Sequence, residues 1–249
     1  MSDQLTVEDV GDGVRTLTLN RPHKLNALSQ SLADDLVAAL GDAEATSEVR
    51  SLVIRGSGPA FCAGADLSEH FAPASMDIGR HVLWDRLEAS RLPVVAAVHG
   101  WAITGGFLLA YCCDVVVASE DARFRDTHAA LALIPTGGES QRMPRRLGFF
   151  RAKELMLTSR PFTAHEAERA GLVARVVTRE SLDDVALEYA RLMASHSPRS
   201  VAAIKRLINQ GSGLDLASGI RLEAVENRFG DANREPDPDR QAALARFKN

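Results

Sequence analysis

The chain has 249 residues, of which 45% are hydrophobic and 25% are charged, and its formal net charge at pH 7 is -4. This composition is typical of a globular protein and excludes extended disorder and collagen-like repeats. The 29 basic residues, against 33 acidic ones, form no basic stripe, so we expect no nucleic-acid partner.

The N-terminal segment and the cysteines bear on cellular location. The first ten residues, MSDQLTVEDV, are acidic and lack the apolar core of a signal peptide. The most apolar stretch, residues 101–118, is interrupted by two glycines and Asp114, which argues against a membrane span. Cys62, Cys112 and Cys113 cannot form a disulfide framework and are typical of a reducing compartment. We therefore expect a soluble, cytoplasmic protein that binds no membrane.

The N-terminal part of the chain predicts two strands and a helix. Leu5–Val10 and Arg15–Asn20 alternate in polarity on either side of a Gly-Asp-Gly turn, which predicts a β-hairpin. A helix is predicted next, because four leucines recur at every fourth position: Leu28, Leu32, Leu36 and Leu40. Ser29 or Ser31 is its expected N-cap, and Gly41 is its expected end.

Three uninterrupted apolar runs follow, Leu52–Ile54, Val94–Val98 and Val115–Val117. Such runs are typical of strands that are buried on both faces. Their alternation with helical segments indicates an α/β fold, although the spacing is too irregular for a doubly wound sheet. From about residue 180 the pattern becomes helical. We expect a core over residues 1–195 and a smaller helical subdomain over residues 196–249.

Common catalytic and cofactor motifs are absent from the sequence. Residues 100–106 have the glycine spacing of a phosphate loop, but Gly106 stands where the lysine is required. A GxGxxG fingerprint, a zinc-binding HExxH helix and a GxSxG nucleophile motif are all missing. We therefore expect no resident cofactor and no metal site.

Two turns of small residues follow apolar runs, Ala60–Leu67 and Gly100–Gly106. Small residues let the backbone approach a ligand closely, and N–H groups at a helix start are free to donate. Two such donors converging on one oxygen would form an oxyanion hole. The alternative is that both segments are simply tight packing turns.

A series of short motifs runs along almost the whole chain in a specific order and spacing. They are Asn20-Arg21-Pro22, Leu25-Asn26-Ala27-Leu28, Ala60–Leu67, Pro93–Gly100, Gly105-Gly106, Cys113-Asp114, Ile134-Pro135, Gly137-Gly138, Arg142–Gly148, Leu157-Thr158, Phe162-Thr163-Ala164 and Ala170–Val173. In this order they resemble the crotonase, or enoyl-CoA hydratase/isomerase, superfamily. The resemblance implies a spiral core of repeated ββα units and a C-terminal helical trimerisation region. It also implies assembly as a homotrimer or a dimer of trimers.

The resemblance further implies an acyl-CoA thioester as substrate, with no cofactor besides its coenzyme A. The N–H groups of Ala65 and Gly105 match the donors that hold the thioester carbonyl and stabilise an enolate. Residues at the family's coenzyme A positions are Lys24, Leu25, Ala27, Ala63, Asp66 and Leu67. Phe247 and Lys248 resemble terminal residues that touch coenzyme A from a neighbouring subunit, or they belong to a frayed tail. Asp66 is alternatively a helix cap.

The sequence departs from the family at both catalytic glutamates. Counting from the flanking motifs, Leu108 occupies the first position and His128 the second. Leu108 cannot transfer a proton and would only line the substrate site, whereas an imidazole titrates near neutrality. Some crotonase-like carbon–carbon hydrolases have histidine at the second position, with an aspartate about two residues past the proline, where this chain has Gly137.

The acids nearest to His128 are Asp126 upstream and Glu139 downstream. Glu139 is a candidate catalytic acid, or an acidic residue that complements a helix dipole. The segment expected to cover the acyl pocket contains several rings and a methionine, which contact substrate or only pack: His70, Phe71, Met76, His81 and Trp84. Cys62 lacks an activating base and is expected to be a small buried filler.

Two classes of function remain open. The first is an enzyme of fatty acid metabolism that acts on an acyl-CoA through an enolate, with His128 transferring a proton. It would be a lyase of the enoyl-CoA hydratase type, or a related isomerase or carbon–carbon hydrolase. The second is a non-catalytic acyl-CoA-binding protein, for which the loss of both glutamates is the motivation.

Overall fold

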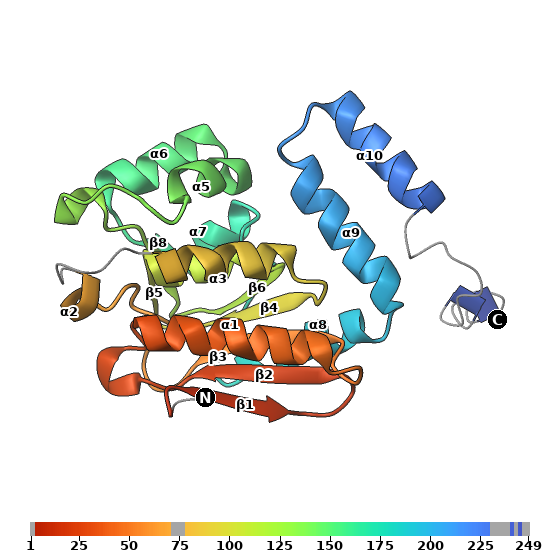
Figure 1. Cartoon of the computed structure of the whole chain (residues 1–249). Coiled ribbons are helices and arrows are strands. Elements are labelled where there is room, and N and C mark those ends of the chain that lie inside the picture. Colours follow the sequence, from red (N-terminus) through yellow and green to blue (C-terminus); the bar gives the residue numbers. More distant parts are fainter. Residues whose placement is uncertain (1–2, 71–77, 230–239, 242–243, 246–249) are drawn as a thin grey trace.

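A computed structural model describes residues 3–70, 78–229, 240–241 and 244–245 of the chain. Its largest element is a six-stranded sheet (Figure 1). The strands lie in the order β1 (Leu5–Asp9), β2 (Val14–Leu19), β3 (Ser51–Gly56), β4 (Val94–Val98), β6 (Val115–Ser119) and β9 (Arg175–Val177). The first two strands form the predicted antiparallel hairpin, and each later neighbouring pair in this sheet is parallel.

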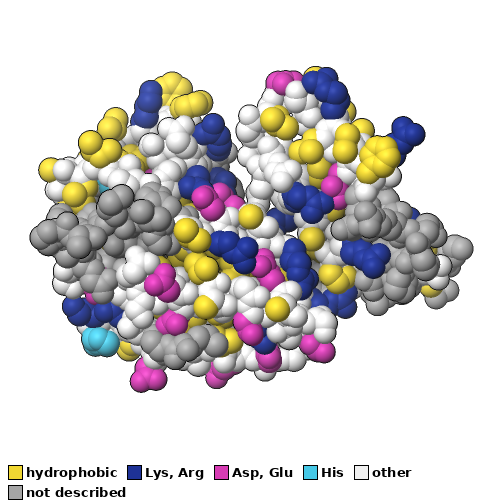
Figure 2. Space-filling model, viewed as in Figure 1, with side chains coloured by type: hydrophobic (Ala, Val, Ile, Leu, Met, Phe, Trp, Pro, Cys, Tyr) yellow, Lys and Arg dark blue, Asp and Glu magenta, His cyan; other side chains and the backbone are white. Residues whose placement is uncertain are grey.

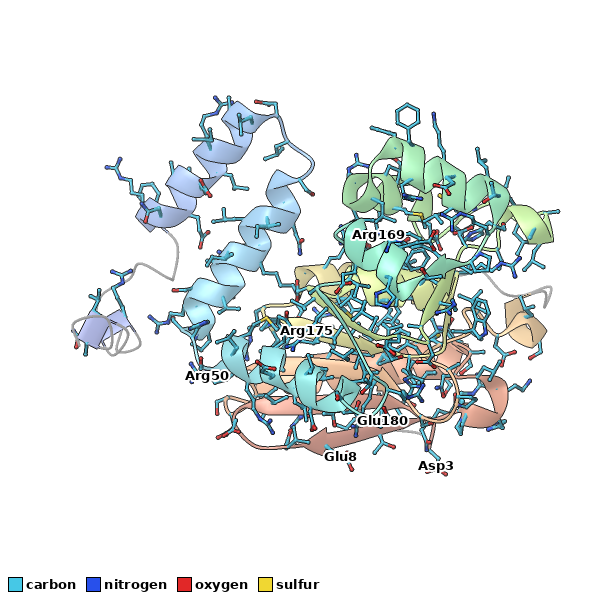
Figure 3. The ribbon with its side chains drawn as sticks, turned by 180° about the vertical axis from the view of Figure 1, so that it is seen from behind. Asp3, Glu8, Arg50, Arg169, Arg175 and Glu180 are labelled. Atoms are coloured by element: carbon cyan, nitrogen blue, oxygen red, sulfur yellow. The ribbon has the colours of Figure 1, made fainter. Side chains whose placement is uncertain are left out.

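The central strands are apolar because helices cover both faces of this sheet. On one face lie α1 (Gln30–Ala45) and α3 (Ile78–Ala89), and on the other lies α8 (Leu182–Ala194), seen from behind in Figure 3. Alternate side chains of β4 enter two separate cores, and all five of its residues are buried. This is the arrangement that an uninterrupted apolar run predicts.

A smaller sheet runs beside the first and contains β5 (Trp101–Ile103), β7 (Arg123–Arg125) and β8 (Phe162–Thr163). Strand β4 leads into β5 and then α4 (Gly105–Cys112), while β6 leads into β7 and then α5 (Glu139–Leu147). After β3, a bridge from Cys62 to Ala102 places the chain beside β5, and α2 (Leu67–His70) follows. Each turn of the chain therefore repeats a ββα unit, as the resemblance implied.

Helix α1 begins as the sequence predicts and ends later. Its N-cap is Ser29, whose Oγ accepts a hydrogen bond from the Leu32 N–H at 3.1 Å. Gly41 was the expected end, but the helix continues to Ala45. The buried side chains of Leu40 and Ala43 lie on either side of Gly41 in the sequence. Their burial outweighs the cost of about 1 kcal/mol that glycine imposes in a helix.

The remaining helices follow the second half of the chain. They are η2 (Ala129–Leu131), α6 (Phe149–Thr158), α7 (Ala164–Arg169), α9 (Pro198–Gly211) and α10 (Leu216–Phe229), while η1 (Pro22–Lys24) lies near the N-terminus. Helices α9 and α10 project to one side of the core in Figure 1. Within the described residues, no helix combines the length and the apolar character needed to cross a membrane.

Candidate active site

The two predicted oxyanion donors lie together. Leu28 forms a bridge to the loop that contains Ala65: its N–H donates to Gly64 O at 2.7 Å, and its carbonyl accepts from the Asp66 N–H at 2.9 Å. Gly105 is the first residue of α4, and a Cβ added to it would lie 3.5 Å from the Ala65 nitrogen. Across the part of the chain that the structure describes, no hydrogen bond uses the N–H of Ala65 or Gly105.

The residue before Gly105 has an unusual backbone conformation. Thr104 has φ 47° and ψ -101°, a strained combination for a β-branched residue. Its N–H donates to Arg125 O at 2.7 Å, its Oγ1 lies 2.6 Å from Thr127 Oγ1, and the same Oγ1 accepts from the Thr127 N–H at 3.1 Å. Because ψ of Thr104 sets the plane of the next peptide, these bonds hold the direction of the Gly105 N–H.

His128 is held by a buried aspartate. Its Nδ1 lies 3.1 Å from Oδ1 and 3.0 Å from Oδ2 of Asp126, and its backbone N–H donates to Oδ1 at 3.1 Å. Asp126 is 1% exposed and His128 is 8% exposed. A carboxylate beside Nδ1 favours the proton on that nitrogen, which leaves the lone pair of a neutral imidazole on Nε2.

Glu139 faces the other ring nitrogen of His128. It begins α5, is 4% exposed, and its Oε1 lies 4.0 Å from His128 Nε2. Its Oε2 is buried and has no hydrogen-bond partner among the described residues. An unpaired buried oxygen is costly, and such cost is commonly found at functional sites.

Burial and charge shift the pKa values of both groups upward. Burial by itself lowers the pKa of His128, but the hydrogen bond and charge of Asp126, together with the charge of Glu139, outweigh it and raise the net value. Burial is the largest influence on the pKa of Glu139 and raises it above its ordinary range. His128 is therefore more readily protonated than a free imidazole, and Glu139 keeps its proton to a higher pH than an exposed carboxyl group does.

One pocket of about 260 Å³ brings the two donors and the two titratable groups together. The predicted site residues in its wall are Ala63, Ala65, Leu67, Gly105, His128 and Glu139. Much of the remaining wall is apolar, including Leu28, Ile103 and Trp84. A small apolar pocket with a few convergent polar groups is the usual form of a substrate site.

Four other predicted coenzyme A residues lie outside the pocket wall: Lys24 ends η1, and Leu25, Ala27 and Asp66 are in loops. The Ala63 N–H donates to Leu25 O at 2.9 Å, so the loops around residues 25 and 63 are neighbours. Asp66 pairs with Arg21 at 2.9 Å and accepts from the Ser68 N–H at 3.2 Å, in accord with its alternative role as a cap. Lys24 is exposed and Ala27 is buried in the same region. Phe247 and Lys248 lie outside the described residues.

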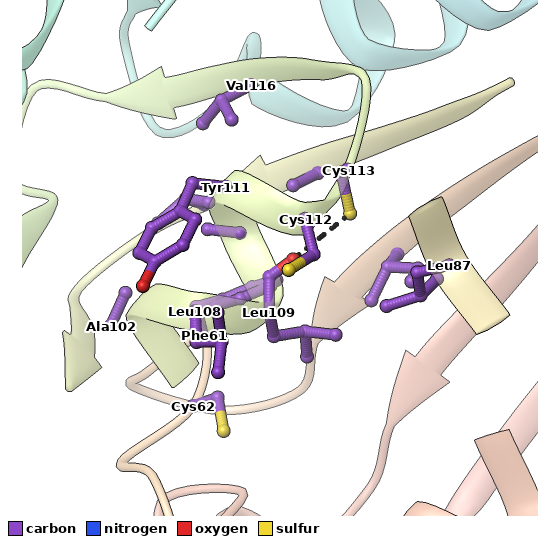
Figure 4. Close-up of a cluster of buried hydrophobic side chains, with 14 of the residues drawn as sticks. Phe61, Cys62, Leu87, Ala102, Leu108, Leu109, Tyr111, Cys112, Cys113 and Val116 are labelled. Atoms are coloured by element: carbon purple, nitrogen blue, oxygen red, sulfur yellow. Dashed lines mark hydrogen bonds between the residues drawn. The ribbon is translucent and has the colours of Figure 1, made fainter. Parts of the chain in front are cut away.

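Leu108 is buried in α4 within a cluster of apolar side chains (Figure 4). A Cβ added to Gly137, which lines the pocket, would meet Leu108 Cδ2 at 2.7 Å, Glu139 Oε1 at 2.9 Å and Trp84 Nε1 at 3.0 Å. Leu108 thus lies near Glu139, although it is not part of the wall itself. A residue larger than glycine at position 137 would therefore collide with Leu108, Glu139 and Trp84.

The predicted cover segment and Cys62 have different outcomes. Of the cover segment, Trp84 lines the pocket, whereas the side chains of His70, Phe71, Met76 and His81 lie outside the described residues. Burial raises the pKa of the Cys62 thiol to about 12, which makes it an inert packing residue. No cluster of His, Cys, Asp and Glu within the described ranges is arranged to hold a metal ion.

Known proteins share this fold and much of this sequence. The family model for enoyl-CoA hydratase/isomerase matches residues 9–234. A probable peroxisomal enoyl-CoA hydratase from Arabidopsis thaliana is 36% identical over 222 residues, covering 88% of this chain and 83% of that protein. The 2,3-dehydroadipyl-CoA hydratase of Escherichia coli is 38% identical over 213 residues, covering 84% of each.

A crystal structure of an enoyl-CoA hydratase from Bacillus anthracis matches the chain with a TM-score of 0.91 at 33% identity. The match covers 98% of this chain and 96% of that one. With the repeated ββα units, this similarity confirms the expected crotonase-like fold. The chain therefore belongs to the enoyl-CoA hydratase/isomerase family.

Proposed function

We propose that the protein is an enzyme that hydrates an α,β-unsaturated acyl-CoA thioester through an enolate. The N–H groups of Ala65 and Gly105 bind the thioester oxygen, and His128 and Glu139 transfer protons. The observation that carries the proposal is their presence around one pocket: two N–H groups that have no hydrogen-bond partner within the described part of the chain, an imidazole nitrogen and a buried carboxyl. The relatives named as hydratases support the choice of reaction.

The proposed chemistry divides acid and base work between two unlike groups. Glu139 accepts a proton from water as the water oxygen bonds to the β carbon, and the electron pair of the double bond moves toward the thioester oxygen. The two backbone donors stabilise the resulting enolate. Protonated His128 then gives its proton to the α carbon. Glu139 returns its proton to solvent and His128 takes one up from solvent, which restores both groups for the next turnover. This assignment replaces the family's glutamate pair, whose first position is Leu108 here.

A non-catalytic acyl-CoA-binding protein is the alternative. The observation that favours it is Leu108, whose apolar side chain is fully buried and cannot transfer protons. This alternative retains the two backbone donors as a carbonyl-binding site. It predicts binding of acyl-CoA thioesters without hydration or exchange of the α-proton.

The proposal needs no cofactor besides the coenzyme A of the substrate. Acyl-CoA chemistry of this kind belongs to fatty acid or related metabolism. The three cysteines are free and buried, which supports the cytoplasmic location that we propose.

The test measures α-proton exchange and hydration in the wild-type chain and in a variant of His128. The protein is incubated in deuterated water with saturated acyl-CoA thioesters, and deuterium uptake is read by mass spectrometry, while hydration of crotonyl-CoA and longer enoyl-CoA thioesters is measured separately. We expect His128→Gln to lower both rates at least about 100-fold, because a positioned acid or base contributes roughly that factor. The control is His165→Gln, since His165 is an exposed residue of α7.

The outcomes separate the two functions. Binding by the wild-type chain without either reaction would support the non-catalytic alternative and contradict the enzyme. Reaction rates that survive His128→Gln would show that another group moves the proton.

A further inference from the structure

We propose that the tripeptide Asp126-Thr127-His128 positions both halves of the catalytic site at once, an inference that rests on the proposed function. Asp126 orients the imidazole of His128. Thr127 holds Thr104 in its strained conformation and so directs the Gly105 N–H. Asp126 and Thr127 are positioning residues in this scheme, because they act through His128 and Gly105.

The Asp126 contact determines which nitrogen of His128 is available. Both carboxylate oxygens lie within 3.1 Å of Nδ1, and Oδ1 also accepts the backbone N–H of His128. Three contacts from one buried side chain leave the ring little freedom to rotate. The Nε2 edge then faces Glu139, whose Oε1 lies 4.0 Å away. The charged groups that face the ring are Asp126, which follows β7, and Glu139, which begins α5.

The Thr127 contacts hold the oxyanion side of the pocket. Its hydroxyl lies 2.6 Å from the Thr104 hydroxyl, and its N–H donates to the same oxygen at 3.1 Å. The positive φ of Thr104 persists only if neighbouring groups compensate for the strain. Losing the hydroxyl of Thr127 removes one of those bonds and lets the peptide before Gly105 relax.

Strand pairing explains how three consecutive residues reach both groups. In the smaller sheet, Ile103 of β5 pairs with Arg125 of β7, and the Thr104 N–H continues the ladder by donating to Arg125 O. The tripeptide therefore leaves β7 directly beside the residues that leave β5. Because one segment anchors His128 and the backbone donor of Gly105, the distance between them is set by the backbone, which is the preorganisation that charge stabilisation requires.

The first experiment tests Asp126 with the Asp126→Asn variant of the full chain. The titration of the His128 ring is followed by NMR in the free protein, and the exchange rate is measured against pH. We expect the pKa of His128 to fall, the acid limb of the rate profile to move to lower pH with it, and the maximal rate to fall about 100-fold. Asp121→Asn, in the turn between β6 and β7, is the control and should leave the His128 titration in place.

The second experiment tests Thr127 with Thr127→Val, and with Thr127→Ser as the variant that keeps the hydroxyl. Each is loaded with butyryl-CoA carrying ¹³C at the thioester carbonyl, and the carbonyl stretching frequency of the bound probe is read by infrared spectroscopy. Stronger hydrogen bonds lower this frequency. We expect Thr127→Val to move the frequency toward that of the free thioester, Thr127→Ser to retain the wild-type value, and both to retain the wild-type His128 titration.

The two readouts decide the inference. It is overturned if Asp126→Asn leaves the His128 titration unchanged, if Thr127→Val leaves the carbonyl frequency unchanged, or if each variant alters both readouts together. Failure of the proposed function can be distinguished from failure of this inference. If the proposed function fails, the wild-type chain binds the probe without α-proton exchange. The NMR and infrared comparisons still report whether Asp126 and Thr127 position His128 and Gly105.

Discussion

Glu139 combines a buried position with an oxygen that has no hydrogen-bond partner among the described residues. Its carboxyl group is more easily protonated in the folded chain than in the unfolded chain, since burial raises its pKa. At pH values between the unfolded-state and folded-state pKa of Glu139, the folded state therefore binds more protons than the unfolded state. In that range the stability contributed by this group decreases as pH rises, and the loss is complete above the folded pKa.

The direction of this pH dependence of stability leads to a prediction for Glu139→Gln. The amide cannot ionise, so the variant escapes the loss of stability on raising the pH. We expect its melting temperature, relative to the wild type, to be higher at about pH 8 than at about pH 5, while its hydration rate falls. Thermal denaturation at the two pH values measures the difference. An equal difference at both would show that Glu139 is not responsible for a pH-dependent cost.

At the scale of elements, helix α9 is attached to the core by a buried lysine. Lys205 is 7% exposed, and its Nζ donates to Leu87 O at 3.0 Å, to Leu92 O at 2.9 Å and to Asp114 Oδ2 at 2.8 Å. Burial raises the pKa of Asp114, and the charge of Lys205 opposes this rise. One side chain thus satisfies three acceptors between the core and the C-terminal helices.

We predict that Lys205→Met destabilises the chain strongly. The variant removes the Lys205 donor from two carbonyls and leaves the Asp114 carboxylate with the Val94 N–H. Because Lys205 is buried but Asp114 is partly exposed, we expect a loss of about 1–3 kcal/mol. Urea denaturation measures the loss. The exposed Lys153 supplies the control variant Lys153→Met, which should be neutral. Adding Asp114→Asn to Lys205→Met should recover part of the loss, and no recovery would contradict the assigned ion pair.

At the scale of the whole molecule, apolar side chains remain exposed on the C-terminal helices and on α6. Figure 2 shows hydrophobic side chains gathered over α10 and over the region of α6. The exposed set includes Phe149, Phe150, Leu157, Leu216, Ile220, Val225 and Phe229. A cavity of about 440 Å³ between α9 and the core is lined in part by Ile204 and Ile208, which are also exposed. Patches of this kind are typical of protein interfaces.

We therefore predict that the chain self-associates, and the resemblance to the family implies a trimer or a dimer of trimers. Ile220→Glu places a charge in the apolar face of α10 and should shift the assembly toward monomers. Sedimentation equilibrium measures the mass, and Glu223→Gln on the same helix is the control. A wild-type chain that sediments as a monomer would contradict the prediction.

Local chemistry explains what the sequence predicted well. The hairpin and the buried strands follow from alternation and from apolar runs, which depend only on neighbouring residues. The family motifs identified the turns that contain Ala65 and Gly105. Their spacing shows that Leu108 and His128 stand where the family has glutamates. The predicted end of α1 at Gly41 was wrong, because the helix continues through the burial of Leu40 and Ala43 in the core, which local sequence rules do not include.

The sequence by itself determined the family, the fold class and which residues stand at the positions of the family's two glutamates. The sequence marks Asp126 as an acid two residues before His128, which is close enough to predict a contact. Thr104 and Thr127 carry no such signal in the sequence. Only the tertiary structure decided that Asp126 holds the ring, that Glu139 faces it, and that Thr127 reaches Thr104. These contacts join segments up to 23 residues apart along the chain. The Thr127–Thr104 contact exists because the register of β5 against β7 places the ends of these strands side by side, and no local pattern encodes that register.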